Sequence, residues 1–510
     1  MNEMDRQQRL AVAAAAEQYR RGKMSRRGFL RLCAAAGFAF TSPYFLSGFG
    51  ATPLAKAAQT LTKAQISATE GPKSASLAET PQQQFLKEVG GKYKGTTLRI
   101  ATESTPPSRA ISQIMQEEFI PLTGIQVEWE QLPLDQVLAK TSMDTAGGLG
   151  STDIYYWDQA WIGRFVNDAV DPSELMAKAD LAYPEWNFDD FLKPLVENIA
   201  TYKGKLGAIP YDIPIYIMMY RRDIFEELKL SVPKTMQEYL DAAKAINEAK
   251  APNVYGTLGQ WKSGHYSLEC DMTCWLWAHG GSIFGADQKP TINDEKAVAA
   301  MEYMLELGKY MPPGATTWDW SGEADAFTQG LAGFYICWGE FFPGFDDPEK
   351  SKIVGLAESA PCPKEIALRT KAECGFDETP GISHQGGSSL AISKYSKNVD
   401  AAWIFLQWAT SSDITTRASI LGGGATPIRR SNFLDPRTLE HNKVMPGTTR
   451  HFQVTLDAIE NRMGTEPHLP AWASLSVDSF AVELGKMTTG QQDIKTTLDN
   501  MAAAAEKATA

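Results

Sequence analysis

Residues 205–230 read KLGAIPYDIPIYIMMYRRDIFEELKL, and the expected fold is built outward from this stretch. The run at residues 215–220 is apolar and rich in β-branched and aromatic side chains, which predicts a buried strand. Proline cannot donate a ladder hydrogen bond, so the prolines that flank Tyr211 and Asp212 interrupt the backbone on either side of them. We therefore expect the chain to cross between two lobes here, with both side chains facing the gap.

Length, composition and charge restrict the class of protein. At 510 residues, 43% of them hydrophobic, the chain can build more than one core, and two domains are expected. The formal net charge is −12, and the body is more acidic still because residues 1–57 are basic. An acidic body disfavours binding to nucleic acid or anionic membranes, so we expect no nucleic-acid partner. No later stretch is apolar for the about 18 residues that a membrane-spanning helix needs.

The N-terminus predicts export. The sequence SRRGFLR at residues 25–31 resembles the twin-arginine export motif, and a weakly apolar stretch follows at residues 32–49. The tripeptide AKA at residues 55–57 then offers a cleavage site, so we interpret residues 1–57 as a twin-arginine signal peptide. Such substrates cross the membrane folded, which places the mature protein in a bacterial periplasm or outside the cell, and we expect the periplasm. The alternative is a basic amphipathic helix on a cytosolic protein.

The remainder of the chain predicts an α/β fold. Residues 58–91 are rich in Ala, Ser, Thr, Gln and Lys, and predict a flexible lead-in. After them, short apolar runs alternate with segments of helical periodicity. Capping boxes predict helices that begin at Asp223 and at Thr235. Strands are expected at residues 97–101, 125–130, 153–157, 215–220, 333–338, 353–357 and 388–393.

In α/β sheets, ligands bind in the loops beyond the carboxyl ends of the strands. This rule selects Glu103, which follows the first expected strand. It also selects Trp157, Asp158 and Trp161, which follow the third. Carboxylates and flat aromatic rings are the groups that bind the hydroxyls and the C–H faces of a sugar or polyol.

Four stretches in this order resemble the family 1 extracellular solute-binding proteins, the periplasmic receptors of carbohydrate-type ABC importers. They are the crossing stretch with its continuation SVPKTMQEYLDAAKAI, then DAFTQGLAGFYICWGE, GGSSLAISKYSKNVDAAWIFLQWATS and GGGATPIRRS. The resemblance implies the type II-like periplasmic-binding-protein fold, in which hinge strands join two α/β lobes and the ligand lies between them. On this basis we assign residues 92–212 and 353–411 to lobe one, and residues 213–352 and 412–510 to lobe two.

The resemblance also implies cleft residues. Tyr211 and Asp212 match the residues that the family places at the first crossing, and Arg429 matches its C-terminal arginine. The full set of expected ligand-binding residues is Glu103, Trp157, Asp158, Trp161, Tyr211, Asp212, Trp261, Trp338, Gly339, Glu340, Gly386, Gly387 and Arg429. Each also has a structural interpretation: Asp158 as a helix N-cap, the tryptophans as core, the glycines as a loop, and Arg429 as a surface ion pair.

Cysteine and histidine spacing predicts no metal site and no cofactor. The body contains Cys270, Cys274, Cys337, Cys362 and Cys374. Cys362 and Cys374 flank a polar loop and could form a disulfide in an oxidising compartment, although each cysteine is also interpretable as a small buried apolar residue. The six histidines show no HExxH or other paired metal spacing.

These features predict a periplasmic receptor that binds a sugar, polyol or short oligosaccharide and delivers it to the membrane subunits of an ABC permease. We expect a monomer that makes and breaks no bond. One alternative is a secreted carbohydrate-active hydrolase or lyase. Another keeps the receptor but changes the solute to glycerol phosphate, a polyamine or another small charged molecule, because Arg429 would suit an anion and the acidic residues a cation.

Overall fold

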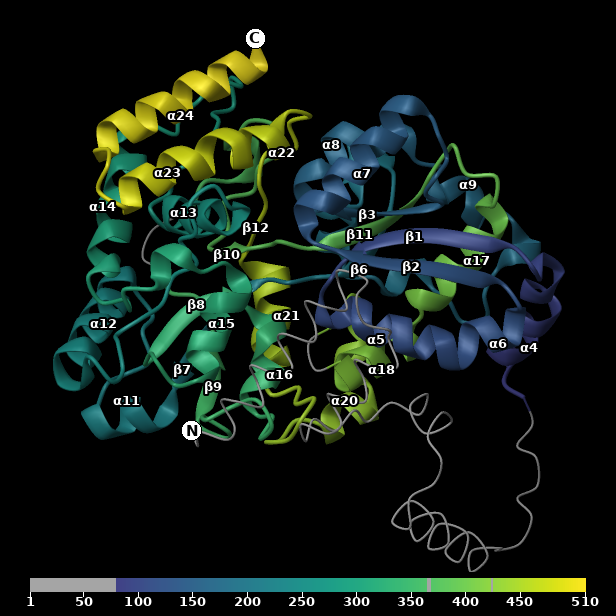
Figure 1. Ribbon diagram of the computed structural model, residues 1–510, viewed down its shortest axis with the longest axis horizontal. Helices are drawn as coiled ribbons and strands as arrows, with labels where there is room; N and C mark the ends of the chain where they lie inside the picture. Colours follow the sequence, from purple (N-terminus) through teal and green to yellow (C-terminus); the bar gives the residue numbers. More distant parts are fainter. Residues whose placement is uncertain (1–78, 365–367, 423–424) are drawn as a thin grey trace, which may run out of the picture. The chain divides into compact units, whose positions relative to one another are not determined.

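A computed structural model describes residues 79–364, 368–422 and 425–510. The expected signal peptide and most of the expected lead-in lie outside these ranges. Within them, no helix combines the length and the apolar character that crossing a bilayer requires. Residues 79–510 form one compact unit with two lobes, each built around its own sheet (Figure 1).

The sheet of the first lobe has five strands in the order β2-β1-β3-β11-β6. The pairs β1–β2 and β1–β3 are parallel, whereas β11 runs antiparallel to both β3 and β6. Helices α5 (Pro106–Ile114), α7 (Leu134–Gly147) and α17 (Val399–Ala409) surround this sheet (Figure 1). The strands are β1 (Thr97–Glu103), β2 (Gln126–Leu132), β3 (Ile154–Asp158), β6 (Ile209–Asp212) and β11 (Ser388–Ile392).

The second lobe contains a three-stranded antiparallel sheet in the order β8-β7-β9. Its strands are β7 (Tyr216–Arg221), β8 (Phe334–Trp338) and β9 (Ala357–Ala360). Helix α13 (Tyr266–Ala278) is buried at every residue, because α14 (Glu295–Gly308) and α23 (Ala481–Thr488) pack against it.

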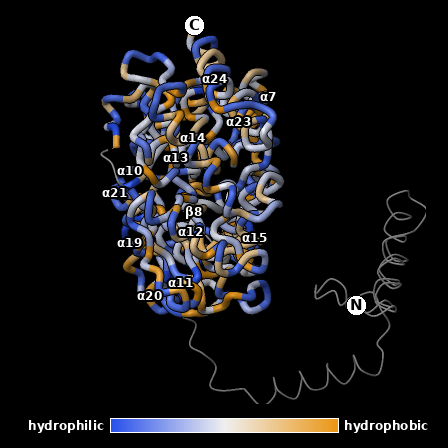
Figure 2. Tube along the Cα trace, turned by 90° about the vertical axis from the view of Figure 1, so that its left-hand side faces the viewer, coloured by the Kyte–Doolittle hydropathy of each residue, from blue (hydrophilic) through white to orange (hydrophobic). Residues whose placement is uncertain are grey.

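The outer helices bury one face each, and polar and apolar residues alternate along them (Figure 2). Helix α12 (Met236–Lys250) begins at the predicted capping box of Thr235 and Glu238, and it buries Ile246. The C-terminal helix α24 (Ile494–Thr509) buries Met501 against the second lobe. Burial of such stripes, together with caps, explains why these segments are helical.

Two segments that connect the lobes pair with each other. One runs from β6 into β7, and the other runs from β10 (Ser383–His384) into β11. Ile215 of the first forms an isolated antiparallel bridge with Gln385 of the second, and the amide of Gly386 donates to the carbonyl of Pro214 at 3.0 Å. We call these paired segments, residues 212–215 and 385–388, the crossing.

The structure corrects the expected lead-in. Helix α4 (Pro81–Glu88) starts at a capping box formed by Thr80 and Gln83. Phe85 is buried and meets the ring of Tyr183 edge-on, with the ring centroids 5.4 Å apart. The prediction of a flexible segment was therefore wrong for these residues, because a short amphipathic helix shows little periodicity in a polar background.

The expected division into lobes was wrong at two places. The strand expected at residues 353–357 lies at β9, and it pairs with β7 in the second lobe, not with the first sheet. Helix α18 (Ser412–Gly422) packs against α5 of the first lobe, although residues from 412 onward were assigned to lobe two. Sequence patterns indicate that a segment is a strand or helix, but not which sheet edge or face it joins.

One local expectation was wrong, and one open alternative is decided. Helix α11 (Arg222–Leu228) has no capping box at Asp223, because that carboxylate binds the guanidinium of Arg221 with N–O distances of 2.6 and 2.7 Å. Cys362 and Cys374 form no disulfide. The thiol of Cys362 donates to the carbonyl of Tyr216 at 3.4 Å instead.

We predict that Gly387→Ala destabilises the protein by about 1–3 kcal/mol, the cost of forcing an extra methyl into a packed site. A Cβ at this position would lie 2.6 Å from the carbonyl oxygen of Asp212 and 2.8 Å from the Cα of Ile213, so the two halves of the crossing would have to separate. Gly91→Ala is the matched control, because its Cβ would meet nothing within 4 Å. Urea unfolding measures both, and equal midpoints would contradict the prediction.

Candidate functional site

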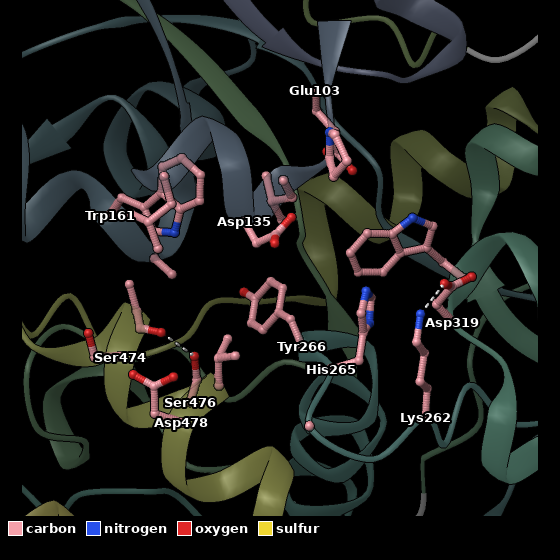
Figure 3. Close-up of a pocket in the computed structure, with 18 of the residues that line it drawn as sticks. Glu103, Asp135, Trp161, Lys262, His265, Tyr266, Asp319, Ser474, Ser476 and Asp478 are labelled. Atoms are coloured by element: carbon pink, nitrogen blue, oxygen red, sulfur yellow. Dashed lines mark hydrogen bonds and ion pairs between the residues drawn. The ribbon is translucent and has the colours of Figure 1, made fainter. Parts of the chain in front are cut away.

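A cavity of about 570 Å³ lies between the lobes, and we call it the cleft. Its first-lobe wall comes from the end of β1, the start of α7 and the turn after β3. Its second-lobe wall comes from the loop before α13, the start of α15 (Trp320–Thr328) and the segment around residues 473–478. Figure 3 shows residues that line it, among them Glu103, Asp135, Trp161, Lys262, His265, Tyr266, Asp319, Ser474, Ser476 and Asp478.

The first-lobe wall presents acidic and aromatic side chains because β1 and β3 both end here. Glu103 is the last residue of β1, and its Oε2 accepts a hydrogen bond from the Tyr156 hydroxyl at 3.1 Å. Trp161 lies in the short helical turn directly after β3, and it is 4% exposed. Asp135 lies in the first turn of α7, where the helix dipole favours a carboxylate.

The second-lobe wall adds the aromatic residues Tyr266 and Trp320 and the histidine His265. His265 caps α13, and its Nδ1 accepts from the amide of Ser267 at 3.2 Å. The His265 ring lies against that of Trp320, with the centroids 4.6 Å apart. Burial and the nearby Lys262 lower the pKa of His265, so a neutral imidazole faces the cleft at pH 7. Lys262 donates to Asp319 at 3.0 Å, and the two charges largely neutralise each other (Figure 3).

A smaller recess of about 30 Å³ continues toward the crossing, and acidic residues line it. Glu103, Asp158 and Glu340 all border this recess, together with Trp338 and Gly386. Burial raises the pKa of Glu103 to about 7. Burial, followed by the charge of Glu466, raises the pKa of Asp158 well above its usual range. Burial, and after it the charges of Asp212 and Glu103, also raise the pKa of Glu340.

This arrangement favours hydrogen-bond donors in the ligand. One oxygen of Glu340 and one of Asp212 have no hydrogen-bond partner among the described residues, although both side chains are buried. A buried acceptor without a donor costs free energy, and ligand hydroxyls or amines can supply the missing donors. The tryptophan and tyrosine rings offer faces on which the C–H surface of a ligand can pack.

Several predicted site residues border these cavities, and others support them from behind. Glu103, Asp158, Trp161, Trp338, Glu340 and Gly386 line the cleft or its recess. Asp158 also has its structural role as an N-cap, since its Oδ1 accepts from the amide of Ala160 at 2.9 Å. Gly339 follows Trp338, and its amide donates to the carbonyl of Ile215 at 2.9 Å, next to the crossing.

Tyr211 and Asp212 lie behind the recess. Tyr211 meets the ring of Tyr156 edge-on with a centroid distance of 6.2 Å, and Tyr156 in turn holds Glu103. Asp212 accepts from the amide of Thr426 at 3.3 Å. Gly387 faces the backbone of Asp212. A glycine at this position leaves room for the two segments of the crossing to approach each other. Whether Tyr211 and Asp212 contact a ligand stays a prediction.

Two tryptophans pack inside the lobes. Trp157 is fully buried and stacks between the rings of Tyr155 and Phe165, with centroid distances of 6.3 and 6.1 Å. Trp261 is 4% exposed and packs beside Gly308 of α14. Neither lines the cleft or its recess, because side chains at strand ends and in loops turn inward as often as outward.

Arg429 is a structural residue of the first lobe, and its assignment to the cleft was wrong. Its guanidinium is 1% exposed and donates to the carbonyls of Thr410 and Asn187. It also lies over the ring of Phe191, with 3.8 Å from the guanidinium carbon to the ring centroid. Burial lowers the pKa of Arg429 to about 10, so it stays charged at pH 7.

Sequence reasoning missed most of the second-lobe wall. Tyr266, His265, Trp320 and the segment at residues 473–478 have no motif, and they come from loops and helix starts. Tyr266 opens an apolar helix, so its pattern resembles that of a core residue. The capping position of His265 was the one available signal, because an N-cap lies at a helix start, where ligand sites are common.

Comparison with known proteins identifies the family. The family model described as bacterial extracellular solute-binding protein matches residues 103–415, and the chain belongs to this family. A probable amino-acid ABC transporter periplasmic-binding protein of Sinorhizobium fredii is 24% identical over 390 residues, which cover 74% of this chain and 83% of that protein. The erythritol/L-threitol-binding protein of Mycolicibacterium smegmatis is 21% identical over 366 residues, 67% of this chain and 72% of that one.

The fold also matches solved structures. An ABC transporter solute-binding protein from Agrobacterium radiobacter, in complex with ribitol, superposes with a TM-score of 0.71. The two sequences are 24% identical, and the match covers 81% of this chain and 99% of the other. The expected two-lobed periplasmic-binding-protein fold is therefore confirmed.

The raised pKa of Glu103 makes a prediction about stability. A carboxylate whose pKa rises from 4.5 to about 7 on folding binds more protons in the folded state, so stability is lost as the pH rises through this window. This one group should lower the free energy of unfolding by about 3 kcal/mol between pH 4.5 and 8. Urea unfolding of the ligand-free protein and of Glu103→Gln at both pH values tests it. The same pH dependence in both proteins would contradict the prediction.

Proposed function

We propose that this protein is the solute receptor of an ABC importer, and that it binds a sugar, polyol or short oligosaccharide in the cleft. The observation that carries the proposal is the composition of the cleft, in which carboxylates converge with Trp161, Tyr266 and Trp320 from two lobes. Relatives whose names state erythritol/L-threitol or mannitol, and a neighbour in complex with ribitol, support a polyhydroxylated ligand.

Lobe closure would couple binding to delivery. A ligand that contacts both walls of the cleft binds the closed form better than the open form, and this difference shifts the population toward closure. A permease that recognises the closed arrangement then receives loaded receptors. The receptor acts as a monomer in the periplasm, which it reaches by the twin-arginine route; the motif at residues 25–31 supports this part of the proposal.

A second candidate ligand carries an amine. The cleft presents Glu103, Asp135 and Asp478 without a matching free cation among the described lining residues, since Lys262 is bound to Asp319. A relative named as a probable amino-acid receptor supports this class. Glycerol phosphate fits less well, because Arg429 lies away from the cleft. A thermal-shift screen of polyols, sugars, amino sugars, polyamines and amino acids separates the classes, since a ligand of the folded state raises its Tm.

We predict that Glu103→Gln weakens binding of the solute identified in that screen about 10-fold to 100-fold, because a charge-assisted hydrogen bond becomes a neutral one. The free protein should stay folded, since burial already disfavours the charged form of Glu103. Calorimetric titration measures the affinity. Glu128→Gln is the matched control, because this glutamate lies on the adjacent strand β2 with its side chain 67% exposed.

Unchanged affinity in Glu103→Gln would contradict the assignment of the cleft. The same titrated samples distinguish a receptor from an enzyme. Recovery of the intact solute by mass spectrometry after stoichiometric binding supports the receptor, whereas release of products at enzyme-like rates would support the hydrolase or lyase.

A further inference from the structure

Three buried side chains converge behind the second-lobe wall of the cleft. Cys270 lies on α13, His384 on β10, and Glu466 lies two residues after the end of β12 (Met463–Gly464). One ligand atom of each lies within 4.8 Å of the other two, and His384 Nε2 is 3.6 Å from Glu466 Oε1. All three side chains are 0% exposed. None of these three residues lines the cleft or its recess.

The hydrogen bonds around His384 fix its tautomer. The hydroxyl of Thr273 donates to the carbonyl of Cys270 at 2.9 Å, so its oxygen must accept at its second contact, 2.7 Å from His384 Nδ1. The ring proton therefore sits on Nδ1, and Nε2 carries a lone pair.

Two electron-pair donors then face each other with nothing between them. His384 Nε2 has no hydrogen-bond partner among the described residues. Their separation of 3.6 Å is too long for a hydrogen bond but matches the edge of a tetrahedral metal site, about 3.3–3.8 Å for bonds of about 2.0–2.3 Å. Among the described residues, no lysine or arginine forms an ion pair with Glu466.

The other oxygen of Glu466 is held by an outer layer of donors. Its Oε2 accepts from Tyr266 OH at 2.6 Å, from Trp472 Nε1 at 2.7 Å and from Gln159 Nε2 at 3.0 Å. In metal sites, hydrogen bonds from the protein typically orient a ligand through one of its atoms, and its other atom is then available to bind the ion. The Nδ1–H of His384 on Thr273 plays the same role for the imidazole.

We infer that Cys270, His384 and Glu466 bind one Zn²⁺ ion. A thiolate, an imidazole and a carboxylate are the donors that zinc accepts together, and a thiolate disfavours magnesium and calcium. Two negative ligands also match the charge of the ion.

The ion would have a structural role in the cleft wall. It joins α13, the strand β10 that precedes the crossing, and the segment after β12, which are far apart in the sequence. Through Glu466 it would hold Tyr266, which lines the cleft, and Gln159, which lies in the turn after β3. Spacing rules missed this site because no two of its ligands share a short motif.

Zinc content of the full chain tests this inference. The protein is stripped with a chelator, loaded with Zn²⁺, desalted and analysed by plasma mass spectrometry. We expect one equivalent in the wild type, and at least about tenfold less retained metal in Cys270→Ser and His384→Gln. Cys274→Ser is the matched control, since Cys274 lies one turn further on the same buried helix and its thiol donates to the carbonyl of Ile382.

Loading with Co²⁺ gives a second test, whose main readout is the wild-type protein. A cobalt thiolate absorbs in the near ultraviolet, so the wild type and Cys274→Ser should show this band. Failure of the wild type to retain metal, retained metal without the thiolate band, or full retention by folded Cys270→Ser would each overturn the inference. Solute binding is not used as a readout, so this result is separate from the proposed function.

Discussion

The pairing of two chain segments at the crossing is the constraint on which the rest of this structure depends. The first segment runs from β6 of the first sheet to β7 of the second, and the second segment leads into β11 of the first sheet. A hydrogen bond from the amide of Gly386 to the carbonyl of Pro214 holds the two segments together between the lobes. The absence of a side chain at Gly387 permits this approach, because the Asp212 carbonyl occupies its place.

The same geometry concentrates acidic side chains in a buried place. The carboxyl ends of β1, β3 and β6 meet beside the crossing, and each ends in an acidic residue: Glu103, Asp158 or Asp212. Burying these carboxylates in their charged form costs free energy in the absence of a ligand. Their raised pKa values reflect this cost. A solute rich in hydrogen-bond donors offsets that cost. The free energy that burial of these groups costs the empty protein is recovered when the solute binds.

Much of the fold could be predicted from the sequence, because strand composition and helix caps are local signals. The strand after Pro214 and the capping box at Thr235 both lie close to where they were expected. The pairing of β9 could not be predicted, since edge choice depends on contacts distant in sequence.

The candidate site was predictable on one wall only. The rule of strand ends found Glu103 and Asp158, because the end of a strand is a local feature. It could not separate Trp161, which faces the cleft, from Trp157, which packs in the core four residues earlier. The second-lobe wall is built from loops without motifs, and Arg429 was misplaced because an arginine pattern does not reveal which carbonyls it meets.

The central claim is that the lobes close around a solute by movement at the crossing. Nitroxide labels on Met143→Cys and Lys244→Cys, one exposed site in each lobe, measure the distance between lobes by pulsed electron resonance, since all five native cysteines of the described chain are buried. Saturation with the solute that most raises the Tm should shorten this distance. An unchanged distance in a protein that calorimetry shows to be loaded would contradict the account.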